Sequence, residues 1–216
     1  MIRCTEEHGQ PMNLIVREGH RCYVLQQSRT KSLVNYVPAL YSELPFYACA
    51  GGKVLMSELP ISLVEKLVDS CDMEPLTPYT IIDPDEFWLE VRKTAKEDMP
   101  LTTRESSDNG SCISVPVRDS EGNIIAALSF SGFVGIKDTD ELLSYLPVLK
   151  EASEEITRNL FQCWAGKPAA YRTISNCGKA APYGIFHKMR LFRVRYDRPD
   201  GLFLIANQAV LNCYSF

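Results

Sequence analysis

The sequence lacks any long apolar run, and no stretch approaches the about eighteen residues that a membrane-spanning helix needs. Its first residues include Arg3, Glu6 and Glu7, whereas a secretion signal would place an apolar segment there. These two absences predict a cytoplasmic protein with no membrane partner.

Histidine is scarce, with three residues in the 216-residue chain, and none of the eight cysteines forms a Cys-x-x-Cys pair. Structural zinc sites usually take two ligands from one tight turn, so this spacing does not favour a metal site. A cytoplasmic chain of this length needs no disulfide bonds. We therefore expect reduced, mostly buried cysteines and no metal or other cofactor.

The charge is unevenly distributed along the chain. Residues 1–160 carry 15 Lys or Arg against 25 Asp or Glu, whereas residues 161–216 carry 8 against 2. An acidic body does not attract DNA phosphates. The charge reversal predicts a domain over residues 1–160 and a basic tail over residues 161–216.

Strand and helix signals alternate through the acidic part of the chain. We expect strand pairs at 12–16 with 22–25 and at 112–117 with 124–131, and helices near 50–56, at 61–71, from 84, and over 139–160. Asp83 is the predicted cap of the helix that begins at Pro84, and Pro147 is predicted to kink or split the last helix. The predicted buried faces include Leu59, Leu63 and Leu67 on one helix, and Phe87, Val91 and Ala95 on another.

The basic tail is compatible with two structures. Arg198-Pro199-Asp200-Gly201 is a turn signal between an arginine-containing apolar run and Leu202 to Ile205, which suits a basic hairpin. A poorly ordered extension is the alternative.

Small polar residues recur on one face of the 112–131 strand pair. Ser129 and Ser131 share a face, as do Cys112 and Ser114. The small residues Ala50-Gly51-Gly52 stand at a predicted helix start, where backbone N–H groups suit a carboxylate. The pattern indicates either a pocket for a small anion or a place where a helix packs closely on the sheet.

Other motifs carry weaker signals. Gly51-Gly52-Lys53 lacks the rest of a phosphate-binding loop. Asp83 and its acidic neighbours suit helix capping better than a metal. Cys112 as a redox or nucleophilic thiol and nucleic-acid binding by the tail arginines remain as alternatives.

Three segments carry a resemblance to a known family: residues 12–16 (MNLIV), 44–56 (LPFYACAGGKVLM) and 112–132 (CISVPVRDSEGNIIAALSFSG). In order and spacing they resemble the effector-binding domain of the isocitrate-lyase-regulator (IclR) family of bacterial transcription regulators, over residues 3–160. The resemblance implies an α+β fold, a GAF-like antiparallel sheet with helices packed on it. It also implies a pocket for small organic, sugar or aromatic acids on one sheet face.

The resemblance further implies which residues bind the effector. The residues implied to bind the carboxylate and its neighbouring oxygens are Ala50, Gly51, Thr102, Cys112, Ser129 and Ser131. The residues implied to form the apolar wall of the pocket are Leu33, Tyr36 and Leu44. Thr102 stands where many relatives have an acidic residue, and Ser111 stands where an arginine is common.

These observations predict the sensing domain of an IclR-type regulator rather than an enzyme. Full-length members also carry a winged helix-turn-helix, which we expect to be missing from this chain, so that no direct DNA contact follows. The expected partners are a small organic-acid effector and either further copies of the chain or full-length relatives in a mixed oligomer. A redox enzyme using Cys112 and nucleic-acid binding by the tail are the alternative functions.

Overall fold

The computed structural model describes residues 1–32, 35, 37–97, 100–119, 121–134, 139–165, 193–195 and 202–204, with the backbone alone at 103, 161–165 and the last two segments. The chain divides into two compact units, Met1–Thr157 and Arg158–Phe216. The elements in chain order are α1 (Ile2–His8), β1 (Met12–Glu18), β2 (Arg21–Ser28), β3 (Glu43–Pro45), the 3-10 helix η1 (Phe46–Ala48), α2 (Ala50–Met56), α3 (Ile61–Asp69), α4 (Pro84–Glu97), β4 (Leu101–Thr103), β5 (Gly110–Arg118), β6 (Ile124–Phe133), α5 (Thr139–Ser144), α6 (Leu146–Ala165), β7 (Arg193–Arg195) and β8 (Leu202–Leu204).

The first unit is built on a six-stranded sheet with the order β3-β2-β1-β6-β5-β4, in which every neighbouring pair is antiparallel. Both predicted hairpins are present, as β1–β2 and β5–β6. Gly19 and Gly122 stand in their turns with φ of +61° and +86°, where an L side chain would be strained. The predicted α+β fold is confirmed.

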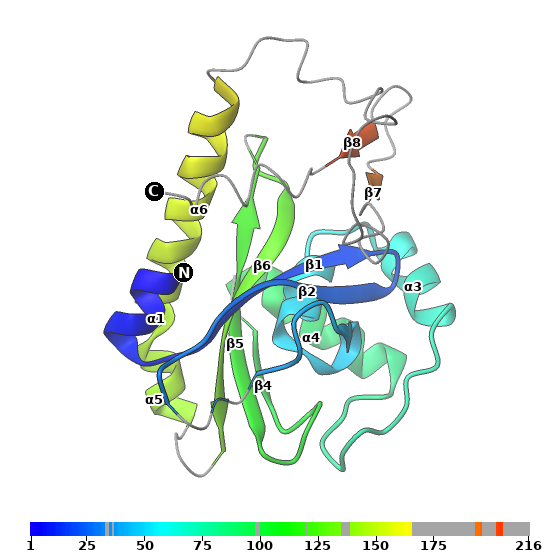
Figure 1. The fold of residues 1–216 in the computed structure, drawn as a ribbon. Coiled ribbons are helices and arrows are strands. Elements are labelled where there is room, and N and C mark those ends of the chain that lie inside the picture. The colour runs from blue at the N-terminus through cyan, green and yellow to red at the C-terminus, as the bar shows by residue number, and fades with distance from the viewer. Residues whose placement is uncertain are drawn as a thin grey trace, which may run out of the picture. The chain divides into compact units, whose positions relative to one another are not determined.

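Helices cover both faces of this sheet (Figure 1). Figure 1 shows α1, α5 and α6 on one side and α2, α3 and α4 on the other. On the first side, the Ser153 hydroxyl of α6 donates to the Pro116 carbonyl of β5 at 2.6 Å. On the second side, α2 packs on β1, β5 and β6.

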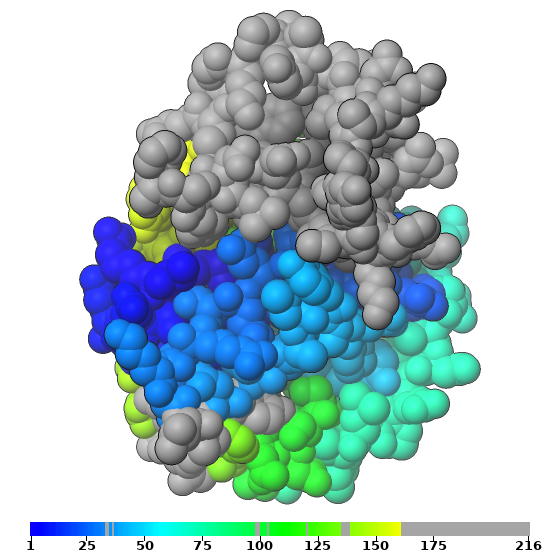
Figure 2. Space-filling model, in the orientation of Figure 1, coloured from blue at the N-terminus to red at the C-terminus, as the bar shows by residue number. Residues whose placement is uncertain are grey.

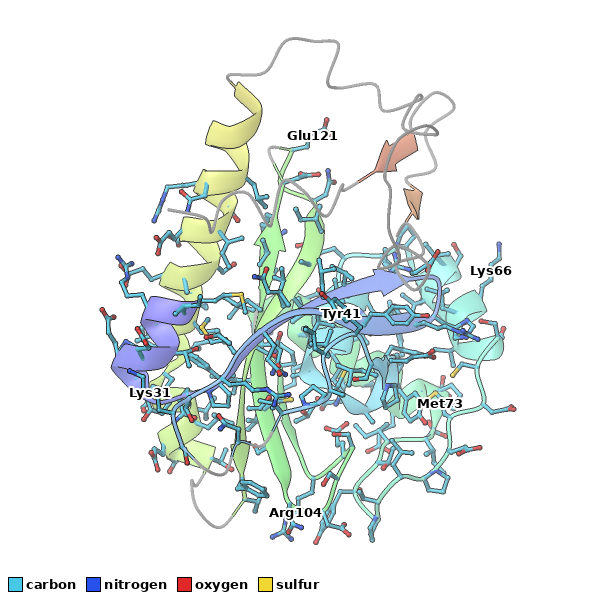
Figure 3. The ribbon with its side chains drawn as sticks, in the orientation of Figure 1. Lys31, Tyr41, Lys66, Met73, Arg104 and Glu121 are labelled. Carbon is cyan, nitrogen blue, oxygen red and sulfur yellow. The ribbon has the colours of Figure 1, made fainter. Side chains whose placement is uncertain are left out.

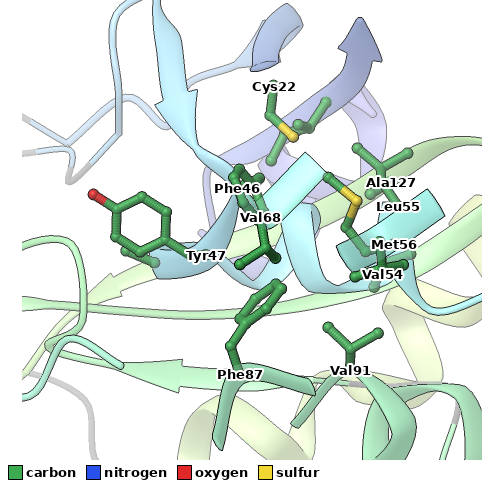
Figure 4. Packing of buried hydrophobic residues seen from close by; sticks show 13 residues of the cluster. Cys22, Phe46, Tyr47, Val54, Leu55, Met56, Val68, Phe87, Val91 and Ala127 are labelled. Carbon is green, nitrogen blue, oxygen red and sulfur yellow. The ribbon is translucent and has the colours of Figure 1, made fainter. Parts of the chain in front are cut away.

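The apolar core under α2 and α4 is centred on Phe46. Its ring lies edge-on to those of Tyr47 and Phe87, with centroids 5.5 and 5.4 Å apart. The rings pack with buried aliphatic residues from α2, α3, α4 and the sheet, including Val54, Val68, Val91 and Ala127 (Figure 4). This cluster fixes α2 against the sheet.

Helix α4 begins where the sequence predicts. The Glu86 backbone N–H donates to the Asp83 side chain at 2.9 Å, which satisfies one of the free N–H groups of the first turn. Phe87 and Val91 are fully buried as predicted.

Two predicted core positions are wrong. Leu63 of α3 is 39% exposed while Val64 and Val68 are buried, and Ala95 of α4 is exposed while Thr94 is buried. A strict spacing of four residues drifts by about 40° per step on a helix, so it leaves the buried face after a turn or two.

Pro147 splits the last helix as predicted. Helix α5 ends at Ser144 and α6 begins at Leu146, so Pro147 lies in the first turn, where its missing N–H breaks no helical bond. Strand β4, in contrast, forms within residues 98–111, a polar and turn-rich part of the sequence. Its pairing with β5 supplies an edge strand that local pattern did not indicate.

In the second unit the described residues are the end of α6 and one antiparallel pair, β7 with β8. The hairpin alternative is thus confirmed for residues 193–195 and 202–204, and the rest of the predicted tail lies outside the described residues. Among the helices in the described ranges, none is long and apolar enough to cross a membrane.

Candidate functional site

A band of neutral polar side chains crosses the sheet on the face that carries α2. The strand registers pair Thr102 with Cys112 and Cys112 with Ser131, and they pair Ser129 with both Ser114 and Asn13. Directly paired residues point to the same face, and Ile15, two residues after Asn13, faces α2. We call this set of residues the polar row: Asn13, Thr102, Cys112, Ser114, Ser129 and Ser131.

The polar row is hydrogen-bonded and mostly buried. Thr102 Oγ1 lies 2.9 Å from Cys112 Sγ, and Asn13 Nδ2 donates to Ser131 Oγ at 3.1 Å. The Ser129 hydroxyl is directed at the Asn13 carbonyl at 3.4 Å. Thr102, Ser129, Ser131 and Asn13 are all at most 6% exposed, and Cys112 is only partly buried.

The start of α2 meets the polar row at Cys112. The backbone of Ala50 lies close enough to the Cys112 thiol to lower its pKa, and the Cys49 sulfur caps the helix by accepting from Gly52 N at 3.3 Å. Burial raises the pKa of the Cys112 thiol, although hydrogen bonds from Thr102 and Ala50 oppose that shift. The thiol is therefore neutral at neutral pH and presents a weak hydrogen-bonding group rather than a charge.

The glycines of α2 serve close packing. A Cβ on Gly51 would lie 2.5 Å from Ile15 Cδ1, so the missing side chain lets α2 approach the sheet. Gly51 thus supports the packing interpretation at its own position. The polar row lies beside this contact, so the packing interpretation does not account for the hydroxyls.

A buried ion pair lies one helical turn beyond Ala50. Lys53 of α2 is fully buried, and its Nζ lies 2.8 Å from Glu105 Oε1 in the β4–β5 turn. Glu105 Oε2 has no hydrogen-bond partner among the residues that the structure describes. Burial raises the pKa of the Glu105 carboxyl despite the opposing effect of Lys53, and Glu90 and Glu86 of α4 raise it further. The charge of Glu105 raises the pKa of the Cys112 thiol, and the charge of Lys53 lowers it.

The predicted apolar wall is only partly described. Leu44 lies in β3, opposite Cys22, and packs against the core cluster around Phe46. Leu33 and Tyr36 lie outside the described residues. The described residues between β2 and β3 include Lys31 and Tyr41, both exposed, and this part of the chain lies at the surface (Figures 2 and 3).

Sequence reasoning missed Asn13 of the polar row and Gln27, whose amide nitrogen donates to Asn13 Oδ1 at 2.8 Å. It also missed the neighbouring ion pair of Lys53 and Glu105. Asn13 interrupts the apolar strand of residues 12–16 and is 1% exposed, so a buried polar residue within an apolar strand was the available signal. For Lys53 and Glu105 no local signal existed, since they lie 52 residues apart.

The family model described as "Bacterial transcriptional regulator IclR C-terminal" matches residues 1–158. The chain belongs to the IclR family. It matches the HTH-type transcriptional repressor AllR of Klebsiella pneumoniae, with 26% identity over 160 residues, which is 74% of this chain and 59% of AllR. It also matches the Pca regulon regulatory protein of Pseudomonas putida, with 23% identity over 161 residues, covering 74% of this chain and 55% of that protein.

Solved structures of IclR proteins share this fold. The Thermotoga maritima IclR structure superposes with a TM-score of 0.67 and 25% identity, covering 73% of this chain and 64% of that one. The inducer-binding domain of the PobR transcription factor from Acinetobacter, a double mutant in complex with 3-hydroxybenzoic acid, gives a TM-score of 0.68 and 26% identity, covering 72% and 92%. Residues 1–158 are thus an IclR effector-binding domain, and the chain spans slightly more than half the length of the curated relatives named above.

Proposed function

We propose that this IclR domain senses a small carboxylic acid, which binds over the polar row. The observation that carries the proposal is the row itself, because buried neutral polar groups occupy consecutive register positions of one sheet face. A purely structural face would gain more from apolar side chains there. The likeness to the PobR inducer-binding domain, solved with an aromatic acid, supports the same ligand class.

The individual roles follow from chemistry. Thr102 and Ser131 offer hydroxyls that donate to carboxylate oxygens, and Cys112 offers a polarisable thiol beside them. The Ser129 hydroxyl donates to the ligand by giving up its long contact, 3.4 Å, with the Asn13 carbonyl. Ala50 and Gly51 at the start of α2 bring positive backbone dipole ends to the same place. Leu44 borders the apolar part of the ligand.

Ligand-dependent thermal unfolding tests the proposal. The probes are 3-hydroxybenzoate, benzoate, lactate and gluconate, which represent aromatic, small organic and sugar acids. A ligand present at about 100 times its dissociation constant adds about 2.7 kcal/mol to the free energy of unfolding, which raises Tm visibly.

A matched pair of variants locates the binding site. Ser131 and Ser153 are 6% and 4% exposed, but Ser153 lies on α6, on the other side of the sheet. We expect Ser131→Ala to abolish the ligand-dependent rise in Tm and Ser153→Ala to preserve it. No rise with any probe, in a protein that unfolds cooperatively, would refute the proposal, and equal loss in both variants would place the ligand elsewhere.

For the whole protein, we infer transcription regulation in the cytoplasm without catalysis, in which effector binding shifts the balance between two arrangements of an oligomer. The AllR and Pca regulon relatives are regulators, which supports this role. Residues 1–158 match a domain that binds effectors, so DNA contact is assigned to other parts of the assembly. Sedimentation with and without the bound probe tests the oligomer, and an unchanged monomer would contradict this mechanism.

A further inference from the structure

A chain of hydrogen bonds runs from the protein surface to the polar row. Arg29 Nε donates to Gln27 Oε1 at 2.6 Å, and Gln27 Nε2 donates to Asn13 Oδ1 at 2.8 Å. Asn13 Nδ2 then donates to Ser131 Oγ at 3.1 Å. Arg29 is exposed, Gln27 is half-buried, and Asn13 and Ser131 are buried. These three hydrogen bonds thus connect the charge of Arg29 at the surface with Ser131 in the proposed effector site.

The direction of every bond in this chain follows from Arg29. A guanidinium has no acceptor, so the Gln27 atom that faces it must be the amide oxygen. The Gln27 nitrogen then faces Asn13 and also donates to the Pro38 carbonyl at 2.9 Å, which fixes its orientation a second time. Asn13 therefore turns its oxygen toward Gln27 and its nitrogen toward Ser131.

Ser131 is left with one committed role. Its oxygen accepts from Asn13, and within the described residues its own hydroxyl proton has no acceptor. Bonds in a directed chain polarise one another, and the first of these is charge-assisted. The Ser131 hydroxyl is consequently a strengthened donor that suits an acceptor with negative charge.

We propose that Arg29, Gln27 and Asn13 are positioning residues that set the Ser131 hydroxyl as a donor, and so make the site select a carboxylate over the corresponding amide. This inference rests on the proposed effector function. It adds three residues to the site and names what they discriminate. An uncharged amide accepts a weaker hydrogen bond from Ser131 than a carboxylate does, because only the bond to the carboxylate is charge-assisted.

A variant that reverses the direction of these hydrogen bonds gives the sharpest test. In Gln27→Glu the carboxylate still accepts from Arg29 but has no N–H for Asn13, so the Asn13 amide turns over and donates to it. The Asn13 oxygen then faces Ser131, whose hydroxyl donates to Asn13 and presents only lone pairs to the ligand. Arg29→Met removes the charge-assisted hydrogen bond that Arg29 donates to Gln27 Oε1. Arg21→Met is the control, because it removes an equal charge from the other end of β2.

The measurement is the ratio of dissociation constants for an amide and its acid, using 3-hydroxybenzamide with 3-hydroxybenzoate and lactamide with lactate. We expect Gln27→Glu to lower the native preference for the acid by at least about tenfold. Arg29→Met should lower it less, because the Pro38 carbonyl still orients the Gln27 amide, and Arg21→Met should leave it unchanged. Thermal unfolding of each variant without ligand confirms that it is folded.

The possible failures are distinguishable. If Gln27→Glu and Arg29→Met weaken the binding of acid and amide equally, or weaken the binding of neither, the inference is overturned. The hydrogen bonds from Arg29 to Ser131 then have only a structural role. If neither acid binds the native protein, the proposed function fails for both ligand classes and this inference falls with it.

Discussion

Gly52, in the first turn of α2, faces the backbone of Phe46 so closely that a Cβ on Gly52 would lie 2.6 Å from the Phe46 Cα. Neither backbone can move away, because Phe46 is the centre of the core beneath α2. Gly51 differs, since its hypothetical Cβ meets the end of the flexible Ile15 side chain.

The first prediction compares these two glycines. Gly52→Ala should lower the free energy of unfolding by about 3 kcal/mol, and Gly51→Ala by about 1 kcal/mol, because only the first overpacks against backbone. Urea denaturation measures both values. A larger loss for Gly51→Ala would show that the two contacts have been ranked wrongly.

The second prediction concerns pH and the buried Glu105. Its pKa is raised by burial in the folded protein, so the folded state holds the Glu105 proton more tightly than the unfolded state. The free energy of unfolding therefore falls as pH rises above the unfolded value of about 4.3, and it levels off above the folded pKa. One proton limits this slope to about 1.4 kcal/mol per pH unit.

Denaturant unfolding of the native protein and Glu105→Gln at several pH values isolates this contribution. We expect the native free energy minus that of Glu105→Gln to decrease as pH rises from about 4 to about 7. Glu121→Gln is the control, since Glu121 is exposed in the β5–β6 turn. Glu121 lies at the other end of the sheet from Arg104, which directly precedes Glu105 in the sequence (Figure 3). A difference that grows with pH would mean that Lys53 outweighs the desolvation of Glu105.

The third prediction addresses the cap of α4. Asp83→Ala leaves the Glu86 N–H without its side-chain acceptor, so we expect a loss of about 1 kcal/mol in the free energy of unfolding. Asp83→Asn keeps an acceptor oxygen and should lose far less. Equal losses in the two variants would indicate that charge, rather than the hydrogen bond, stabilises this helix start.

The fourth prediction separates the sensor from the redox alternative. Burial raises the pKa of Cys22 to about 12 and raises those of Cys49 and Cys112 as well. At about pH 8 the native protein should alkylate slowest at Cys22 and Cys49, and faster at the partly exposed Cys4 and Cys71. Peptide mass spectrometry after timed iodoacetamide treatment gives the order. A redox enzyme requires Cys112 to react fastest of these five.

The hairpins and the cap of α4 could be predicted from sequence because their signals are local. Strand alternation and a Gly-containing turn lie within a few residues of each other, and so do Asp83 and Glu86. Leu63 failed because its exposure depends on which side of α3 meets the core, and neighbouring valines occupy that side. Local spacing finds a helix more easily than it orients one.

The candidate site was predictable in part for the same reason. Cys112, Ser129 and Ser131 lie on one hairpin, so their shared face follows from period and turn alone. Asn13 donates to Ser131 across 118 residues of sequence, and its role needs the pairing of β1 with β6. That pairing depends on tertiary packing, which leaves no trace near either residue.

The pairing of β1 with β6 also limits how early the domain can fold during its synthesis. During synthesis β1 leaves the ribosome well before one of its two neighbours, β6, which lies 116 residues later at the Ser129–Asn13 contact. At synthesis rates of about 5 to 20 residues per second, one side of β1 stays unpaired for about 6 to 23 seconds. During that interval the nascent β1–β2 hairpin exposes the apolar residues of the future sheet centre. We therefore expect chaperone binding to this hairpin to end when β6 emerges.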